Sequence, residues 1–107
     1  MPRLRGQVKC LLSSDNQTDS ATIKTGPCAF GGIYWSVSED VVFEVFDNTA
    51  ASGKKVAPWN EVDEGMIVKG SQETWAYTVD PPIFCEIGIH VNIVSGENFG
   101  YIVVYDE

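Results

Sequence analysis

The sequence is poor in basic residues, and this scarcity excludes whole classes of partner. It has 7 Lys and Arg against 15 Asp and Glu, which gives a formal net charge of −8. Proteins that bind nucleic acids or anionic membranes gain affinity from basic residues that displace counterions from the polyanion. We therefore expect neither a nucleic-acid nor a membrane partner.

Long hydrophobic runs are also missing. The longest apolar stretches are only a few residues, too short to cross a bilayer or to serve as the core of a secretory signal. The chain is therefore expected to fold in the cytoplasm where it is made. Its 107 residues bury roughly 65% of their extended surface on folding. They suffice for one domain and are too few for a barrel enzyme or a two-domain enzyme.

The residue types of catalytic and metal sites are scarce. The one histidine, His90, lies on the polar side of an alternating segment, and no pattern places it beside a nucleophile. The three cysteines, at positions 10, 28 and 85, form no CxxC pair and favour free, buried thiols. The acidic cluster at 61–64 lacks the spacing of a calcium-binding loop. We predict no enzyme, no cofactor and no metal.

Alternation of apolar and polar residues is what the sequence has in abundance. Successive side chains of a strand point to opposite faces, so this period of two indicates strands. The clearest case is Ile83–Val94, which is read as one strand with one apolar face. Other strands are predicted at 4–12, 28–37, 41–47, 54–59, 73–79 and 99–105. Gly31-Gly32 is expected to form a bulge or a close backbone approach, and Pro81-Pro82 to end a strand.

Seven or eight short strands, with turns between them and no convincing helical period, predict an all-β fold. The expected architecture is a single antiparallel β-sandwich of jelly-roll or immunoglobulin-like type. Residues 28–107 form the sandwich. Residues 1–27 form an N-terminal strand or arm and a polar loop, which is part of the domain or packed on it.

Three basic residues, Arg3, Arg5 and Lys9, stand within the first nine positions, whereas the rest of the chain is strongly acidic. They are either a solvated strand face or a positive segment that docks on an acidic partner or on a neighbouring copy. The three tryptophans, Trp35, Trp59 and Trp75, leave a similar choice. Exposed and coplanar, they would stack on sugar rings; buried, they would belong to a core or a subunit interface.

A second group of candidate contact residues follows the strand at 41–47. Asp and Asn side chains bond the backbone two residues on, Gly takes a positive φ, and two alanines permit close packing. The segment is therefore either a structural connection between strands or a contact surface for another copy or a capsid. Its members are Asp47, Asn48, Thr49, Ala50, Ala51, Ser52 and Gly53.

These elements resemble a known family. GGIYWSV, VVFEVFDNTAASGKKV and GIHVNIVSGENFGYIVVYDE are similar, in this order, to small β-sandwich virion proteins of tailed bacteriophages and prophages. The resemblance covers residues 28–107, and DNTAASG is its specific part. It implies a non-enzymatic head-decoration or cement protein, assembled in the host cytoplasm and located in the virion. The implied partners are the major capsid protein or other virion subunits and further copies in a homo-oligomer, for which a trimer would fit capsid threefold sites. The alternative is a carbohydrate-binding or host-adhesion module of a fibre or tail.

Overall fold

The chain forms two antiparallel sheets. The structure is a computed structural model, and it describes residues 12–58 and 65–107. Sheet A contains, in spatial order, β1 (Leu12–Ser13), β9 (Phe99–Asp106), β3 (Cys28–Val37) and β7 (Thr74–Cys85). Sheet B contains β2 (Ala21–Thr25), β8 (Gly88–Ser95), β4 (Val41–Phe46) and β5 (Lys55–Ala57), and β6 (Met66–Val68) also pairs with β4. A 3-10 turn, η1 (Gly70–Gln72), precedes β7.

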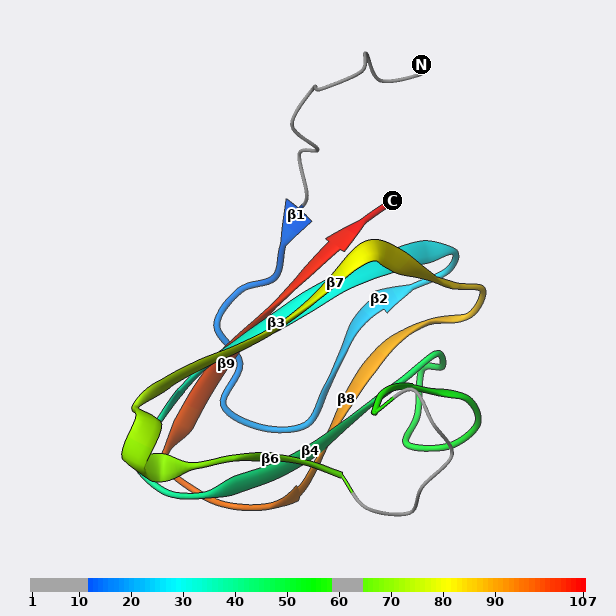
Figure 1. The fold of residues 1–107 in the computed structure, drawn as a ribbon. Coiled ribbons are helices and arrows are strands. Elements are labelled where there is room, and N and C mark those ends of the chain that lie inside the picture. Colours follow the sequence, from blue (N-terminus) through cyan, green and yellow to red (C-terminus); the bar gives the residue numbers. More distant parts are fainter. Residues whose placement is uncertain (1–11, 59–64) are drawn as a thin grey trace, which may run out of the picture.

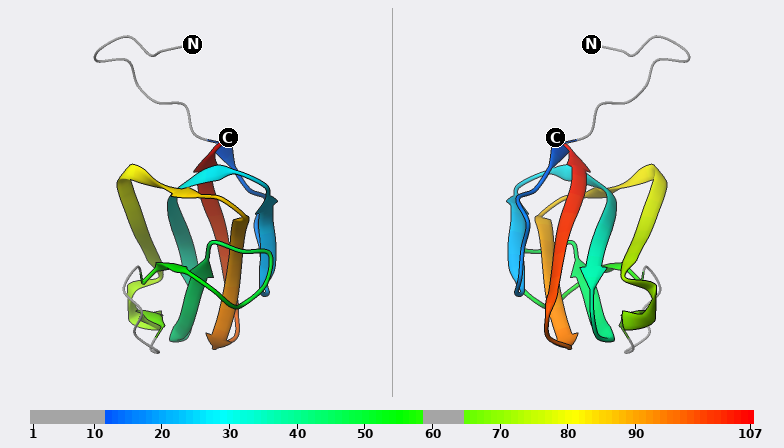
Figure 2. Two further views of the ribbon diagram at one scale, coloured as in Figure 1. Left: turned by 90° about the vertical axis from the view of Figure 1, so that its right-hand side faces the viewer. Right: turned by 90° about the vertical axis from the view of Figure 1, so that its left-hand side faces the viewer.

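The connectivity identifies the sandwich as a jelly roll. Consecutive strands from β1 to β4, and again from β7 to β9, belong alternately to sheet A and sheet B. The two sheets form two layers (Figures 1 and 2), and the orders 1-9-3-7 and 2-8-4-5 are those of a jelly roll. The predicted all-β sandwich is confirmed. It has nine strands among the described residues, because 21–25 and 66–68 form strands that the pattern does not predict.

The core lies between the sheets and is centred on aromatic side chains. Trp35 of β3 packs against Phe43 of β4 and Tyr101 of β9, with ring centroids 4.8 and 4.6 Å apart. Phe30, Ile33 and the valines of β4, β8 and β9 that face inward are fully buried around them. Each such side chain contributes about 1.5–3 kcal/mol when it leaves water, so the alternation of apolar residues holds the two layers together.

A bulge in β3 is explained by its glycines. The register of β3 against both β7 and β9 shifts between Phe30 and Gly32. Gly32 has φ +149°, and a Cβ there would lie 2.6 Å from the carbonyl oxygen of Tyr77. Only glycine fits this close approach, so the predicted bulge is confirmed.

The prediction that Pro81-Pro82 ends a strand is wrong. Phe30 pairs with Ile83 while Gly32 pairs with Thr78, so the intervening residues of β7, prolines included, bulge outward inside one long strand. Among the described residues β7 pairs only with β3, so it lies at the edge of sheet A. An edge strand tolerates proline because the missing N–H does not break a ladder bond.

The single strand predicted at Ile83–Val94 is also wrong. The chain turns at Glu86–Ile87, so that β7 ends at Cys85 in sheet A and β8 begins at Gly88 in sheet B. Ile87 lies exposed in this turn but is apolar, so the apolar alternation continues through the turn. The sequence pattern therefore does not reveal where one strand ends and the next begins. Consequently Cys85 and His90 lie in different sheets rather than on opposite faces of one strand.

Residues 12–27 are part of the sandwich. β1 belongs to sheet A and β2 to sheet B, and the segment between them passes over β9. Gln17 and Tyr101 exchange backbone hydrogen bonds of 2.8 and 3.0 Å, and the Tyr101 hydroxyl donates to the carbonyl oxygen of Asp19 at 2.6 Å. No helix in the described part of the chain has the length and apolar character needed to span a membrane.

Candidate functional site

Asp47 ties the end of β4 to the turn between β7 and β8. It directly follows β4 and is 7% exposed. Its carboxylate accepts hydrogen bonds from the backbone N–H groups of Glu86, Ile87 and Gly88, at 3.0, 2.9 and 3.3 Å. Glu86 and Ile87 form the β7–β8 turn, and Gly88 is the first residue of β8. The role of Asp47 is therefore structural.

The loop after Asp47 is held by its own polar groups. The Asn48 amide donates to the carbonyl oxygen of Ser52 at 2.9 Å, and its oxygen accepts from the Thr49 N–H at 2.7 Å. Gly53 has φ +87°, a conformation that lets the chain reverse its direction and come back beside Asp47, whose N–H donates to the carbonyl oxygen of Lys54 at 2.8 Å. The Thr22 hydroxyl of β2 donates to the carbonyl oxygen of Thr49 at 3.1 Å. Figure 2 shows the green loop crossing the outside of β8 toward β2. The loop thus covers part of the outer face of sheet B.

The predicted contact residues of this loop divide into two groups. Asp47 and Asn48 point inward and serve the local structure, as their hydrogen bonds show. Five consecutive residues at the tip are exposed: Thr49, Ala50, Ala51, Ser52 and Gly53. Of the predicted contact residues that the structure describes, four therefore offer exposed side chains to a partner, and Gly53 offers only its backbone. The other predicted contact residues, Arg3, Arg5 and Lys9, lie outside the described residues, as does Trp59.

The tryptophans that the structure describes do not form a sugar-stacking platform. Trp35 is 3% exposed and lies at the centre of the core. Trp75 packs against the core edge-on to Phe43, at 5.9 Å, and stacks on Tyr77 at 6.3 Å. Both rings face the interior of the sandwich, so the surface alternative for these two residues is not realised.

Burial shifts the pKa values of His90 and Cys85. His90 pairs its Nδ1 with the Thr22 hydroxyl at 2.9 Å, and burial lowers the pKa of its imidazole. Burial also raises the pKa of the Cys85 thiol to about 12. Low-pKa thiols are the reactive ones, and Cys85 has the opposite character. No group of three or more His, Cys, Asp or Glu side chains in these ranges could hold a metal ion.

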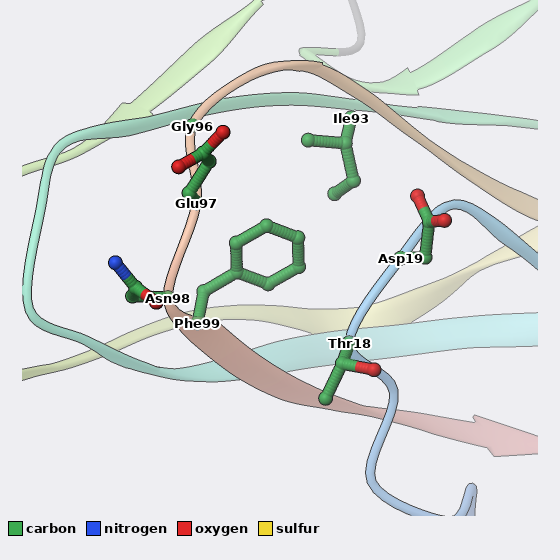
Figure 3. A pocket seen from close by; sticks show the side chains of 7 residues that line it. All are labelled: Thr18, Asp19, Ile93, Gly96, Glu97, Asn98 and Phe99. Atoms are coloured by element: carbon green, nitrogen blue, oxygen red, sulfur yellow. The ribbon is translucent and has the colours of Figure 1, made fainter.

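A hollow of about 470 Å³ lies between the segment before β2 and the β8–β9 hairpin. The Phe99 ring stands in its centre, with Asp19 and Glu97 on opposite sides (Figure 3). Asp19 already accepts a hydrogen bond from the Ser20 N–H at 2.8 Å. No histidine, cysteine, lysine or arginine lines the hollow, which is completed by Thr18, Ile93, Gly96 and Asn98. Its two carboxylates have no cation beside them in the lining, and we read the hollow as a polar surface depression.

The outer face of sheet A is the most distinctive surface of the molecule. Tyr34 stands at its centre, paired with Ile102 of β9 on one side and with Ala76 of β7 on the other. Cross-strand partners share a face, so the register defines the surface, which we call the Tyr34 face. Its members are Ala29, Gly32, Tyr34, Ser36, Thr74, Ala76, Thr78, Phe84, Gly100, Ile102, Val104 and Asp106.

The Tyr34 face is almost free of charge. Asp106, at one end, is the only ionisable side chain among these members apart from the tyrosine hydroxyl, although 21% of the chain is charged. Asp80 of the β7 bulge borders the face, where it lines a hollow of about 270 Å³ with Tyr34, Thr78 and Val104. Tyr34 is 44% and Phe84 59% exposed. Shallow hollows of about 350 and 210 Å³ flank the Tyr34 ring on its β7 and β9 sides. The outer face of sheet B differs, because it carries the Glu44–Lys55 ion pair and lies partly under the loop.

Sequence reasoning missed this surface because it treated tyrosines and β-branched residues as core. The signal was present in the alternation. The positions between the core residues of three strands carry Thr, Ala, Ser, Gly and Tyr where a solvated face would carry Lys and Glu. These positions join into one patch only when it is known which strands are neighbours in the sheet.

Comparisons with known proteins add nothing to this description. No family model, no curated protein and no solved structure matches the chain.

Proposed function

We propose that this protein is a non-catalytic structural protein of a bacteriophage virion, which decorates or cements the head shell through protein–protein contacts. The Tyr34 face carries the proposal. Large exposed apolar patches mark binding sites on soluble proteins, and Tyr34 and Phe84 expose large rings on this face. The resemblance of residues 28–107 to small virion proteins supports the choice of partner, and the jelly roll is an architecture that viral capsid domains use.

The face has the composition of a protein interface. Interface cores are depleted in charged residues and enriched in tyrosine, and Tyr34 rises between two hollows into which partner side chains fit. Apolar area buried there contributes roughly 25 cal/mol per Å² before ordering costs. The surrounding negative charge keeps unbound copies soluble. The protein would act without chemistry, because the free energy of its contacts with shell subunits adds to the stability of the shell.

A second candidate function, carbohydrate binding on a fibre or tail, is supported by one observation. The hollow on the β9 side of Tyr34 also contains Asn16 and Ser36, which could donate hydrogen bonds to a sugar that stacks on the ring. Lectin domains also use jelly rolls. Only one exposed aromatic ring borders this hollow, since Trp35 is buried, so we place this function second.

The test uses heads assembled without this protein. Purified chain is mixed with the heads and sedimented, and we expect it to co-sediment. Tyr34→Lys places a charge at the centre of the face and should weaken binding about tenfold or more. Ile67→Lys is the matched control, because Ile67 is an exposed apolar residue of β6 in the other sheet, and it should bind as wild type. Absence of co-sedimentation would overturn the shell role. Glycan binding that Tyr34→Lys abolishes would support the second candidate instead.

A further inference from the structure

The long free edge of β7 sets it apart from every other edge strand described. β1 has two residues, β5 and β6 have three each, and β2 has five with a register shift between Thr22 and Lys24. β7 has twelve residues and, among the described residues, only β3 as a partner. Figure 2 shows it at the margin of sheet A. Long free edges are templates for pairing with another strand.

The first half of this edge lacks the usual protection against pairing. Proteins blunt edges with lysine, proline, bulges or short strands. Thr74–Val79 has no charged residue and no proline, and its register against β3 is regular from Gly32 to Ser36. The bulge that contains the two prolines begins at Val79, after the last regular pair, Gly32 with Thr78. Five consecutive residues, Thr74–Thr78, therefore present a straight, uncharged edge.

The ladder with β3 determines which backbone groups are directed outward. The Val37 N–H donates to the carbonyl oxygen of Glu73 at 2.7 Å. Hydrogen-bonded pairs alternate in an antiparallel ladder, so Trp75 and Tyr77 also direct their backbone groups toward β3. The N–H and C=O groups of Thr74, Ala76 and Thr78 then point away from sheet A.

We propose that these groups pair with the β7 edge of a second copy, antiparallel and about a twofold axis through Ala76. In this register Ala76 faces the other copy's Ala76, and Thr74 faces its Thr78. Every outward N–H and C=O of the three residues finds a partner. Trp75 faces the other copy's Tyr77 on the inner side, and aromatic and Thr–Thr cross-strand pairs are favourable.

The self-complementary register selects a second copy as the occupant, because the same strip supplies both the donors and the acceptors. Two chains of net charge −8 repel each other, and a strip without charge keeps this repulsion out of the contact itself. The register keeps the acidic residues that flank the strip, Glu73 and Asp80, from facing each other across the axis. The pairing joins two A sheets into one continuous sheet, and the two Tyr34 faces become one double-sized surface. The inference does not depend on the proposed virion role.

The test is the solution mass of the purified full chain over a concentration series, by size-exclusion chromatography with light scattering. We expect the mass to approach twice 11.7 kDa as concentration rises. The double variant Thr74→Lys with Thr78→Lys opposes two lysines at each Thr pair, and should raise the dissociation constant about tenfold or more. Its matched control, Thr74→Glu with Thr78→Lys, opposes Glu to Lys and should keep the dimer. Both residues are exposed, and circular dichroism checks that the variants fold.

Three results would overturn the pairing: a monomer at all concentrations, a trimer, or equal effects of the two double variants. A chain that stays monomeric at all concentrations but still binds heads would show that copies do not pair along this edge. That result would reject the second copy while leaving the virion role intact. A dimer that binds no heads would support the pairing and reject the virion role.

Discussion

Cys28 of β3 lies directly opposite Cys85 of β7 in the sheet register. Both side chains are buried, 3% and 0% exposed, and the Cys85 thiol donates to the carbonyl oxygen of Ile83 at 3.7 Å. Burial raises the pKa of both thiols, that of Cys85 to about 12. Both cysteines are free, which agrees with the sequence prediction, but the prediction gave no reason to place them together.

We predict that an added oxidant such as diamide joins Cys28 and Cys85. The two thiols lose two protons and two electrons, and the azo group of diamide is reduced to a hydrazine. Directly paired antiparallel residues have Cα atoms at a separation that a disulfide spans. The reaction should be slow at neutral pH and faster at alkaline pH, because the thiolate is the reactive form. Mass spectrometry of the Cys10→Ser variant should show the loss of two hydrogen atoms.

The same disulfide should stabilise the fold. It would close a loop of more than fifty residues, which the chain-entropy model values at roughly 4 kcal/mol. Urea unfolding with and without reductant measures the gain. In the Cys10→Ser variant that also carries Cys85→Ser, oxidation should no longer raise the stability. Thiols that remain fully alkylatable after prolonged alkaline oxidation would contradict the prediction.

Asp47→Ala should destabilise the protein by about 2–3 kcal/mol, because three backbone N–H groups of the β7–β8 turn lose their acceptor. Asp47→Asn keeps one side-chain oxygen and should cost less. Urea denaturation gives both values. Glu97→Ala, in the exposed β8–β9 hairpin, serves as the control and should change stability by less than about 0.5 kcal/mol. Unchanged stability of Asp47→Ala would mean that Asp47 does not hold the turn.

The ion pair of Glu44 and Lys55 should show strong coupling. Their side chains are only 11% and 14% exposed, and Glu44 also accepts from the Asn92 amide at 3.2 Å. Lys55→Met leaves the carboxylate without its cation and should cost about 2–4 kcal/mol. The double variant Glu44→Gln with Lys55→Met removes both charges, so its cost should be clearly below the sum of the single costs. Additive costs from thermal unfolding would contradict the coupling.

Asp40 should contribute to acid sensitivity. The Gly70 N–H, which donates to its carboxylate at 2.9 Å, and then Lys69 lower the pKa of this group. The pKa of Asp40 in the folded protein lies below the ordinary value of 3.8. The ionised carboxylate therefore stabilises the fold above about pH 3.8, and this stabilisation is lost as pH falls toward the folded pKa. Asp40→Asn should therefore flatten the stability curve below about pH 4. Lys69→Met should flatten it less, because the backbone donor remains. An unchanged curve for Asp40→Asn would refute this.

The architecture was predictable from the sequence because alternation reports burial on one face. Cys28–Val37 and Val41–Phe46 emerge almost as predicted, and so does the glycine bulge. The turn at Glu86–Ile87 was not predictable, since its exposed Ile87 continues the apolar pattern and its stabilising carboxylate comes from Asp47, about forty residues away. Ala21–Thr25 was missed because its side chains are mostly polar, as suits an edge strand with one solvated face.

The candidate surfaces were harder to predict than the strands. DNTAASG suggested side chains that bond the backbone two residues on. This is wrong for Asp47, whose carboxylate binds the turn at Glu86–Ile87, whereas Asn48 does act within the loop, on Thr49 and Ser52. The Tyr34 face needs three strands that are distant in the sequence to be neighbours, and local patterning carries no information on that order. The β7 edge likewise became visible only once the register showed which side of the strand β3 occupies.

The pairing of β1 with β9 also determines how the fold responds to tension. Leu12 faces Tyr105, so the chain enters and leaves the sandwich at the same end, on adjacent antiparallel strands (Figure 1). A pull on the two ends would open this pair like a zipper, one hydrogen bond after another, instead of shearing many bonds at once. A partner that bears mechanical load would therefore have to bind this protein through its sheets, with no force transmitted through its two ends.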